Sequence, residues 1–372
     1  MKNMLMSIIG IGLGHATRSE AIYNELKDKM KIKILSYGDA RNYLERKGIV
    51  SSDFGGQVYK GEEFTFNALI QLKDFLNNPT KLRDDYREFK KIADEFKPDI
   101  IFSDSEPNSF VYANREKIKN AILTNVVTTI TNYNILPKNL RTGEVKLQKV
   151  FLNKLVDFML KRTDKLFVPS FERKIKYKEK VEYVDLIVRK KPDELPNEKE
   201  IRKKLGINKK FYYVSVGGSD IERYILNIFE DILPRFKNKY FVVSSNYAKN
   251  RIIEKENMII YPFINNPFEF MKISEGIIST AGHSAISEAI VYKKPMLAIP
   301  VRKHIEQIVN AALLEKNGFG KACFFEKRIN PHKLIESIET FFENKNDIEF
   351  NFKKSKFQGK GSEQIAKKLE KL

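Results

Sequence analysis

The segment from Ser279 to Ala311 contains residues whose types and order could bind a phosphorylated ligand. An apolar stretch from Gly276 to Ser279 leads into a short turn, and the chain after the turn is predicted to be helical. The turn and the first helical residues are small or polar: Thr280, Ala281, Gly282, His283 and Ser284. A helix start leaves backbone N–H groups unpaired and carries the positive end of the helix dipole, so it can hold a diphosphate without a metal. Glu288, about one and a half turns further on, could accept hydrogen bonds from a vicinal diol such as a ribose.

A second polar group follows the next predicted strand. The apolar stretch from Pro295 to Pro300 precedes His304, and Glu306 and Gln307 come shortly after it. Open α/β sheets bind their ligands at the carboxyl ends of their strands. We therefore expect Glu306 and Gln307 to lie at the same edge of the sheet as the turn at 280–284. The alternative is an ordinary buried strand-helix unit with polar residues on its surface.

A glycine-rich turn near the N-terminus could expose a general base. Met4 to Ile11 is predicted to be a buried strand, and Gly12 and Gly14 lead to His15, at the start of a helix that reaches about Met30. The spacing is wrong for a dinucleotide site, because the third glycine follows the second by two residues instead of three. A histidine can accept a proton near neutral pH, so His15 is the first candidate base. A structural or acceptor-binding role is the alternative.

Two acidic residues are further candidates for catalysis. Asp104 and Glu106 follow the predicted strand from Ile100 to Ser103, at another carboxyl end. Either carboxylate could orient His15 or act as the base itself.

Length and composition predict two α/β domains. At 372 residues the chain is too long for one typical core, and 42% hydrophobic residues suffice to build two. Apolar stretches alternate with amphipathic ones, which is the pattern of doubly wound parallel sheets. The stretch from Val188 to Lys199, which is rich in proline and charge, is the predicted linker. We therefore expect domains at 1–187 and 188–345, followed by a C-terminal tail at 346–372.

Charge and cysteine usage narrow the classes of partner. The net charge of +19 favours an anionic partner, for which nucleotide sugars, nucleic acids and acidic lipids all qualify. Nucleic-acid recognition motifs are absent from the sequence, so we expect no nucleic acid to bind. Cys323 is the single cysteine, which excludes an internal disulfide and fits a cytoplasmic location. No stretch reaches the eighteen or so apolar residues that a membrane span needs.

One predicted helix has two interpretations. The stretch from Val145 to Arg162 places apolar residues along one side with lysines between them. These apolar residues are Val150, Phe151, Leu155, Phe158 and Met159. The helix either packs on the sheet with its lysines in water, or rests as a basic amphipathic surface on the inner face of an anionic membrane.

Several ordered motifs resemble those of GT-B glycosyltransferases, and most closely the MurG-like branch in its uncharacterised archaeal type. The motifs are Gly-x-x-x-x-x-Glu from Gly282, Lys-Pro-Met-x-x-x-Pro from Lys294, Glu-Gln-x-x-Asn-Ala from Glu306, and the Gly-His pair at Gly14. The resemblance spans nearly the whole chain. It implies two Rossmann-like domains facing each other across a cleft, with a C-terminal helix near Glu363 to Leu369 crossing back to the first domain.

The resemblance also implies roles for individual residues. The donor site would contain Gly217, Gly218, Ser219, Arg223, Phe263, Ile264, Thr280, Ala281, Gly282, His283, Ser284, Glu288, Glu306 and Gln307. The acceptor-side loop would contain Gly12, Gly14 and Arg18. Family members carry a charged residue where this chain has Thr280, so a phosphate contact is missing there. We expect His283 either to replace that contact or to be an ordinary residue at a helix start.

The expected activity is therefore an inverting, metal-independent transfer of a sugar from a UDP-sugar to an acceptor hydroxyl or phosphate. The acceptor would be a carbohydrate or lipid-linked compound, with no cofactor and no obligate protein partner. The sequence Asp-Ser-Glu at Asp104 to Glu106 is faintly similar to the metal-binding motif of another glycosyltransferase fold. Its position in the first half of the chain does not favour a metal site there. A hydrolase or epimerase of nucleotide sugars on the same scaffold is the alternative.

Overall fold

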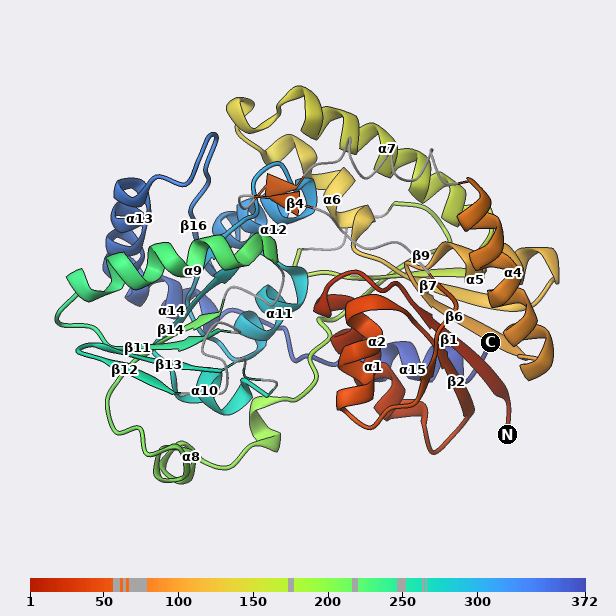
Figure 1. The fold of residues 1–372 in the computed structure, drawn as a ribbon, viewed down its shortest axis with the longest axis horizontal. Coiled ribbons are helices and arrows are strands. Elements are labelled where there is room, and N and C mark those ends of the chain that lie inside the picture. Colours follow the sequence, from red (N-terminus) through yellow and green to blue (C-terminus); the bar gives the residue numbers. More distant parts are fainter. Residues whose placement is uncertain are drawn as a thin grey trace.

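Two parallel sheets with helices on their faces build the chain (Figure 1). The computed structural model describes residues 1–55, 61–62, 65–66, 79–172, 177–215, 220–245, 252–262, 264 and 266–372. The strands of the first sheet lie between residues 3 and 184, and those of the second between residues 212 and 322. The boundary expected between 187 and 188 falls in the connecting segment and stays a prediction.

The first sheet has seven strands in the order β3-β2-β1-β6-β7-β8-β9, and all of its pairs are parallel. Its strands are β1 (Asn3–Ile8), β2 (Lys31–Leu35), β3 (Ser51–Ser52), β6 (Ile100–Asp104), β7 (Lys119–Leu123), β8 (Lys165–Pro169) and β9 (Val181–Val184). β6 is buried at every residue, as a central parallel strand with helices on both faces should be. β1 ends three residues earlier than we predicted, which leaves Gly10 and Gly12 in the loop before α1.

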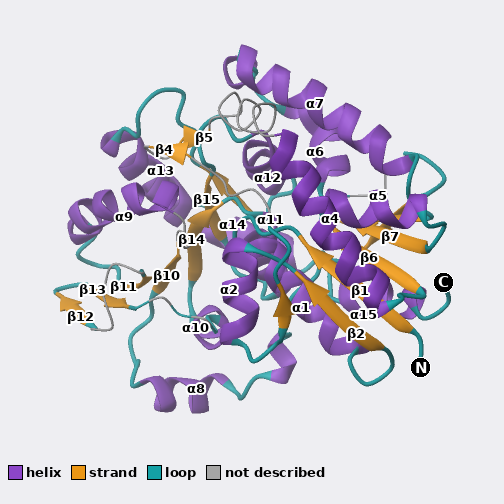
Figure 2. Ribbon diagram, turned by 45° about the vertical axis from the view of Figure 1, so that its right-hand side comes forward, coloured by secondary structure: helices purple, strands orange, loops and turns teal. Residues whose placement is uncertain are grey.

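The helices of the first half alternate with these strands (Figure 2). They are α1 (Leu13–Leu26), α2 (Gly38–Arg46), α4 (Pro79–Phe96), α5 (Pro107–Arg115), α6 (Val126–Asn132) and α7 (Gly143–Leu160). We predicted two helices between Phe64 and Phe96. The second is α4, which begins at Pro79, where proline fits the first helical turn. The short strand β5 (Thr65–Phe66), which pairs with β4 (Gly61–Glu62), stands where the first was expected to begin, and the remainder of that helix lies outside the described residues.

The second sheet also has seven strands, in the order β12-β13-β11-β10-β14-β15-β16, with only the edge strand β12 antiparallel. Its strands are β10 (Tyr212–Ser215), β11 (Phe241–Ser244), β12 (Ile253–Lys255), β13 (Met258–Tyr261), β14 (Gly276–Thr280), β15 (Met296–Ile299) and β16 (Gly320–Ala322). Its helices are α8 (Glu198–Leu205), α9 (Asp220–Ile232), α10 (Phe268–Ile273), α11 (His283–Val291), α12 (Ile305–Lys316), α13 (Pro331–Glu343) and α14 (Lys345–Phe352). α8 starts inside the stretch that we predicted to be a linker.

The C-terminal helix returns to the first half, as predicted. α15 (Gly361–Leu369) packs beside α1 (Figure 1), and its Ile365 and Leu369 are fully buried in the N-terminal core. Burying two such side chains contributes about 3–6 kcal/mol before entropy costs. Gly361 permits the close approach, because a Cβ there would lie 2.2 Å from the carbonyl oxygen of Asp185.

Candidate active site

The carboxyl ends of the central strands of both sheets meet where the two halves touch. The start of α11 contacts the first half at two points. Ser284 Oγ donates a hydrogen bond of 3.2 Å to the carbonyl oxygen of Gly14, and His283 Nε2 lies 3.1 Å from the carbonyl oxygen of Pro169. The start of α12 approaches α6, where Asn125 Nδ2 lies 3.5 Å from Glu306 Oε1. The predicted donor-side and acceptor-side residues therefore face each other across this seam.

His15, Arg18 and Ser19 converge on Asp104 at the end of β6. His15 Nδ1 lies 2.7 Å from Asp104 Oδ1, and Arg18 Nε donates a bond of 2.7 Å to Asp104 Oδ2. Arg18 also forms an ion pair with Oδ1, and Ser19 Oγ donates to Oδ2 at 2.9 Å. The carboxylate is fully buried, whereas 28% of the His15 side chain is exposed. The backbone of the next residue, Ser105, has the left-handed φ of 57°, a strained conformation typical of functional sites.

The charges in this cluster determine which nitrogen of His15 carries a proton. Burial on its own would raise the pKa of Asp104, but the charges of Arg18 and His15 lower it to about 2. Asp104 is therefore ionised and only accepts hydrogen bonds. At 2.7 Å, Nδ1 of His15 must be the donor to this carboxylate, so its contact of 3.0 Å with Arg18 is not a hydrogen bond. In the neutral form of the ring, Nε2 then carries no proton and can accept one.

Glu106 lies two residues from Asp104 but has different contacts. It is the N-cap of α5, and its Oε2 accepts from Ser109 N at 3.0 Å and from Ser7 Oγ at 3.3 Å. Asn108 donates to the other oxygen at 3.2 Å. Burial raises the pKa of Glu106 to about 7. These are the contacts of a helix cap, and they do not favour the catalytic role that we considered for Glu106.

The start of α11 presents backbone groups but no added cation. Gly282 is the N-cap, with no side-chain cap. Thr280 and Ala281 before it are buried. His283 is buried too, which lowers its pKa to about 4 and keeps the ring neutral at pH 7. Its Nε2 is engaged by Pro169, so the structure does not show His283 in the place of the missing charged phosphate contact.

Glu288, the predicted diol acceptor, forms a buried ion pair with Arg189. Arg189 NH2 and Nε lie 3.2 and 3.4 Å from Glu288 Oε1. Burial raises the pKa of Glu288, and the positive charge of Arg189 opposes that rise. Both contacts use Oε1, so within the described part of the chain Oε2 is the oxygen that could accept from the hydroxyls of a ligand.

Glu306 and Gln307 lie on the first turn of α12. His304 is the N-cap, since its Nδ1 accepts from Gln307 N at 3.4 Å, and Lys303 before it has a left-handed φ of 58°. Burial opposes ionisation of Glu306, but the histidines and Arg18 around it lower its pKa. Gln307 Oε1 accepts from Val301 N at 2.9 Å, so its amide nitrogen is the group left for a ligand.

Part of the predicted donor site lies outside the described residues. Gly217, Gly218, Ser219 and Phe263 belong to that part, and only the backbone of Arg223, in α9, is described. Ile264 N donates to Ser244 Oγ at 3.0 Å. The roles that the resemblance implies for these residues stay predictions.

Sequence reasoning missed two residues of the site. Arg189 was overlooked because it stands in a lysine-rich segment where a buried arginine does not differ from its neighbours. Asn125 follows β7, so the rule about carboxyl ends could have found it. Asn125 is 6% exposed, and its Oδ1 is buried with no hydrogen-bond partner among the described residues. Such an orphaned acceptor beside Glu306 fits a group that binds substrate.

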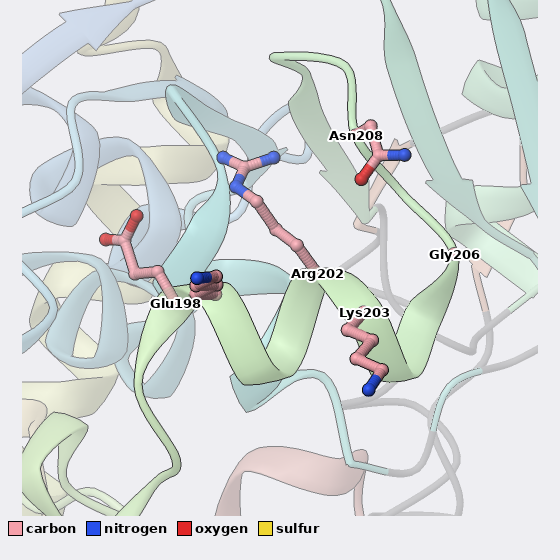
Figure 3. Close-up of a pocket in the computed structure, with 6 residues that line it drawn as sticks. Glu198, Arg202, Lys203, Gly206 and Asn208 are labelled. Atoms are coloured by element: carbon pink, nitrogen blue, oxygen red, sulfur yellow. The ribbon is translucent and has the colours of Figure 1, made fainter.

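A surface hollow elsewhere does not belong to this site. It has a volume of about 670 Å³ and is lined by α8 and the turn after it (Figure 3). Arg202 in its wall donates to the carbonyl oxygens of Lys209 and Ile273 at 3.1 and 2.9 Å. Arg202 and Lys203 lie in the last turn of α8, where positive charge stabilises the helix.

Part of the apolar side of α7 is exposed, which differs from the interpretation in which that side packs on the sheet. Leu147, Val150 and Phe151 are 43%, 53% and 52% exposed, although we expected Val150 and Phe151 on a side that packs against the sheet. Exposed Lys146 and Lys154 flank them. Among the described residues, no helix combines the length and the apolar character that a membrane crossing requires.

Two Rossmann-like domains with a polar cluster at their seam and a returning C-terminal helix define the GT-B class. The chain belongs to glycosyl transferase family 1, whose match covers residues 2–342, and it is a glycosyltransferase. It is 22% identical to an uncharacterized glycosyltransferase of Methanosarcina mazei, over 92% of this chain and 91% of that protein.

A second relative has a MurG-type name. This UDP-N-acetylglucosamine–N-acetylmuramyl-(pentapeptide) pyrophosphoryl-undecaprenol N-acetylglucosamine transferase of Clostridium botulinum is 27% identical, over 96% of this chain and 95% of that protein. Among solved structures, a UDP-glucosyltransferase from Polygonum tinctorium aligns with a TM-score of 0.71 and 12% identity, over 100% of this chain and 99% of that one. The fold predicted from the motifs is thereby confirmed.

Proposed function

We propose that this glycosyltransferase moves a hexose or N-acetylhexosamine from a UDP-sugar to an acceptor hydroxyl, with inversion and without a metal ion. The observation that carries the proposal is the pair of His15 and Asp104 on the first domain, facing the starts of α11 and α12 on the second. The name of the Clostridium botulinum relative supports a UDP-linked N-acetylhexosamine donor.

In the proposed reaction His15 Nε2 takes the proton of the acceptor hydroxyl. The acceptor oxygen bonds to the anomeric carbon while the bond from that carbon to the diphosphate oxygen breaks, and the electron pair leaves with UDP. Attack on the face opposite the leaving group inverts the anomeric configuration. Asp104 stabilises the imidazolium that forms, because its ionised carboxylate already accepts from Nδ1.

The donor would lie against the second domain. The unpaired amides at the start of α11 would hold the diphosphate, so that no cation is required to neutralise it. Glu288 Oε2 would accept from the ribose hydroxyls, and Glu306 with the Gln307 amide would bind hydroxyls of the transferred sugar. The acceptor would then lie on the side of the first domain, near Asn125.

A lipid-linked acceptor is favoured by the surface of α7. Its exposed apolar residues stand among lysines, as in helices that lie on anionic membranes. We propose that α7 holds the protein peripherally at the inner membrane face, where such an acceptor would be found.

The proposal is tested by binding and by product analysis. A thermal-shift screen of UDP, UDP-glucose and UDP-N-acetylglucosamine should raise the melting temperature, with the same shift in EDTA. Product from an α-linked UDP-sugar should be the β-anomer by NMR. Free sugar released at the same rate with and without acceptor would instead indicate a hydrolase, and an absent shift with all three compounds would contradict UDP-sugar binding.

A further inference from the structure

Three side chains connect the first domain to Glu288 through the segment between the domains. Glu20 of α1 accepts a hydrogen bond from the hydroxyl of Tyr43 of α2. The same hydroxyl accepts from Arg189 NH1 at 3.1 Å, and Arg189 in turn holds Glu288 Oε1. We call this set, Glu20, Tyr43, Arg189 and Glu288, the inter-domain relay.

The relay is buried at Tyr43 and Glu288 and partly exposed at Glu20 and Arg189. Tyr43 is 1% exposed, and the side chains of Arg189 and Glu288 are 13% and 10% exposed. The guanidinium of Arg189 also lies 4.5 Å from the ring of Phe268, which fixes the plane of the group. A planar guanidinium held on one side by a ring and on another by a phenol has little freedom to turn. The direction from which it meets Glu288 is therefore determined in part by Tyr43.

The relay contains one cation between two carboxylates. If the guanidinium of Arg189 could move, water or a ligand hydroxyl could take its place at Glu288 Oε1. Because Tyr43 and Glu20 hold Arg189, Oε1 of Glu288 stays occupied and Oε2 stays available. A carboxylate held in one orientation binds a diol with less ordering cost than a mobile one.

We propose that Tyr43 and Glu20 are positioning residues for the donor site, and that through Arg189 they set the preference of Glu288 for a ribose over a deoxyribose. This inference rests on the proposed function, in which Glu288 contacts the ribose. The first domain thus determines part of the donor selectivity of the second. No residue of the first domain needs to touch the nucleotide for this effect.

The test compares UDP with 2′-deoxy-UDP by calorimetry on the full chain. Wild type should bind UDP more tightly, and Tyr43→Phe should weaken UDP about 3–10-fold while leaving 2′-deoxy-UDP nearly unchanged. Tyr112→Phe is the matched control, because Tyr112 is also buried, at 3% exposed, and its hydroxyl also donates to a carboxylate, Asp94, at 2.7 Å. The control should keep the wild-type preference even if its melting temperature falls.

A double-mutant cycle of Tyr43→Phe with Glu288→Gln should be non-additive for UDP affinity, since both changes act on the same contact. Equal weakening of both nucleotides by Tyr43→Phe, or strict additivity in the cycle, would overturn the relay. If Glu288→Gln keeps the full preference for UDP, the ribose contact itself is wrong. If wild type binds neither nucleotide, the proposed function fails and the relay fails with it.

Discussion

His15 is the residue on which the proposed chemistry depends, and its contacts separate catalysis from structure. Its ring is partly exposed and makes one hydrogen bond, to Asp104. Arg18 and Ser19 also donate to that carboxylate, so removing the ring of His15 does not leave it without partners. Asp104 is a poorer target, because its loss would leave Arg18 buried without its partner, which costs several kcal/mol.

We therefore predict that His15→Ala lowers kcat about 10²–10⁴-fold, the usual contribution of general-base catalysis. The melting temperature and its shift with UDP should stay close to those of wild type, because the proposed donor site lies on the other domain. Steady-state kinetics and thermal unfolding measure the two effects. A variant with normal kcat would assign the base to another group.

Glu106 gives the complementary prediction. Its oxygens cap α5, so Glu106→Gln, which keeps an acceptor, should retain activity and fold. Glu106→Ala should lower the free energy of unfolding by about 1–2 kcal/mol, as loss of an N-cap does, with kcat in the folded fraction unchanged. Urea unfolding and kinetics distinguish the cases. A large loss of kcat in the glutamine variant, with normal stability, would restore Glu106 as a catalytic candidate.

At the scale of elements, the starts of α11 and α12 form the proposed donor side, and both helices follow inner strands of the second sheet, β14 and β15. The first turn of α11 contains no acidic residue that would repel a phosphate, and His304 caps α12. His283 couples α11 to β8 of the other domain through Pro169. Protonation of His283 should therefore lower the free energy of unfolding of the whole chain.

The pKa of His283, lowered by burial to about 4, predicts a pH-dependent stability. The unfolded ring titrates near its ordinary value, so between that value and pH 4 the unfolded state binds the additional proton. Stability is thus fully present above the unfolded pKa and is lost as the pH falls. From pH 7.5 to pH 5 this group should cost about 2 kcal/mol.

The measurement is urea unfolding of wild type and His283→Gln at pH 7.5 and pH 5. Glutamine can still donate to the Pro169 carbonyl but does not titrate, so the variant should lose less stability over this interval. Identical losses in both proteins would show that His283 does not remain neutral in the folded chain.

The strands of the two sheets could be predicted from the sequence, whereas some contacts between the domains could not. Buried strands such as β6, β14 and β15 were predictable, because a parallel sheet covered on both faces requires continuous apolar runs. The approach of His15 to Asp104 also followed from adjacent carboxyl ends. The pairing of Arg189 with Glu288 did not, since 99 residues separate them and only the packing of two domains brings them together. The capping role of Glu106 was hidden by its nearness to Asp104.

At the scale of the whole molecule, apolar and polar contacts both join the two halves. α15 buries apolar side chains on α1. Tyr133, Leu136 and Phe171 of the first half belong to the same buried apolar cluster as the core of the second sheet. The polar contacts of Gly14 with Ser284 and of Asn125 with Glu306 add to this apolar packing. We therefore expect apolar burial to hold the halves together, and the polar groups between them to be those that can contact a substrate.

The outer surface of α7 adds the last prediction. Replacing Leu147, Val150 and Phe151 with serine removes three half-exposed apolar side chains and leaves every lysine in place. Binding to phosphatidylglycerol vesicles should fall about tenfold or more, because each buried apolar side chain contributes about 1 kcal/mol or more at the interface. Stability should hardly change, since these side chains pack little in the folded chain.

Phe350 supplies the control for this surface. It is 53% exposed and lies beside Lys353 and Lys354, so it matches Phe151 in exposure and charge but belongs to α14. Phe350→Ser should bind vesicles as wild type does, and neither protein should bind phosphatidylcholine well, because the lysines need an anionic surface. Equal losses for the α7 and α14 variants would mean that adsorption does not depend on α7 in particular. Unchanged binding by the α7 variant would exclude α7 as the membrane-facing surface.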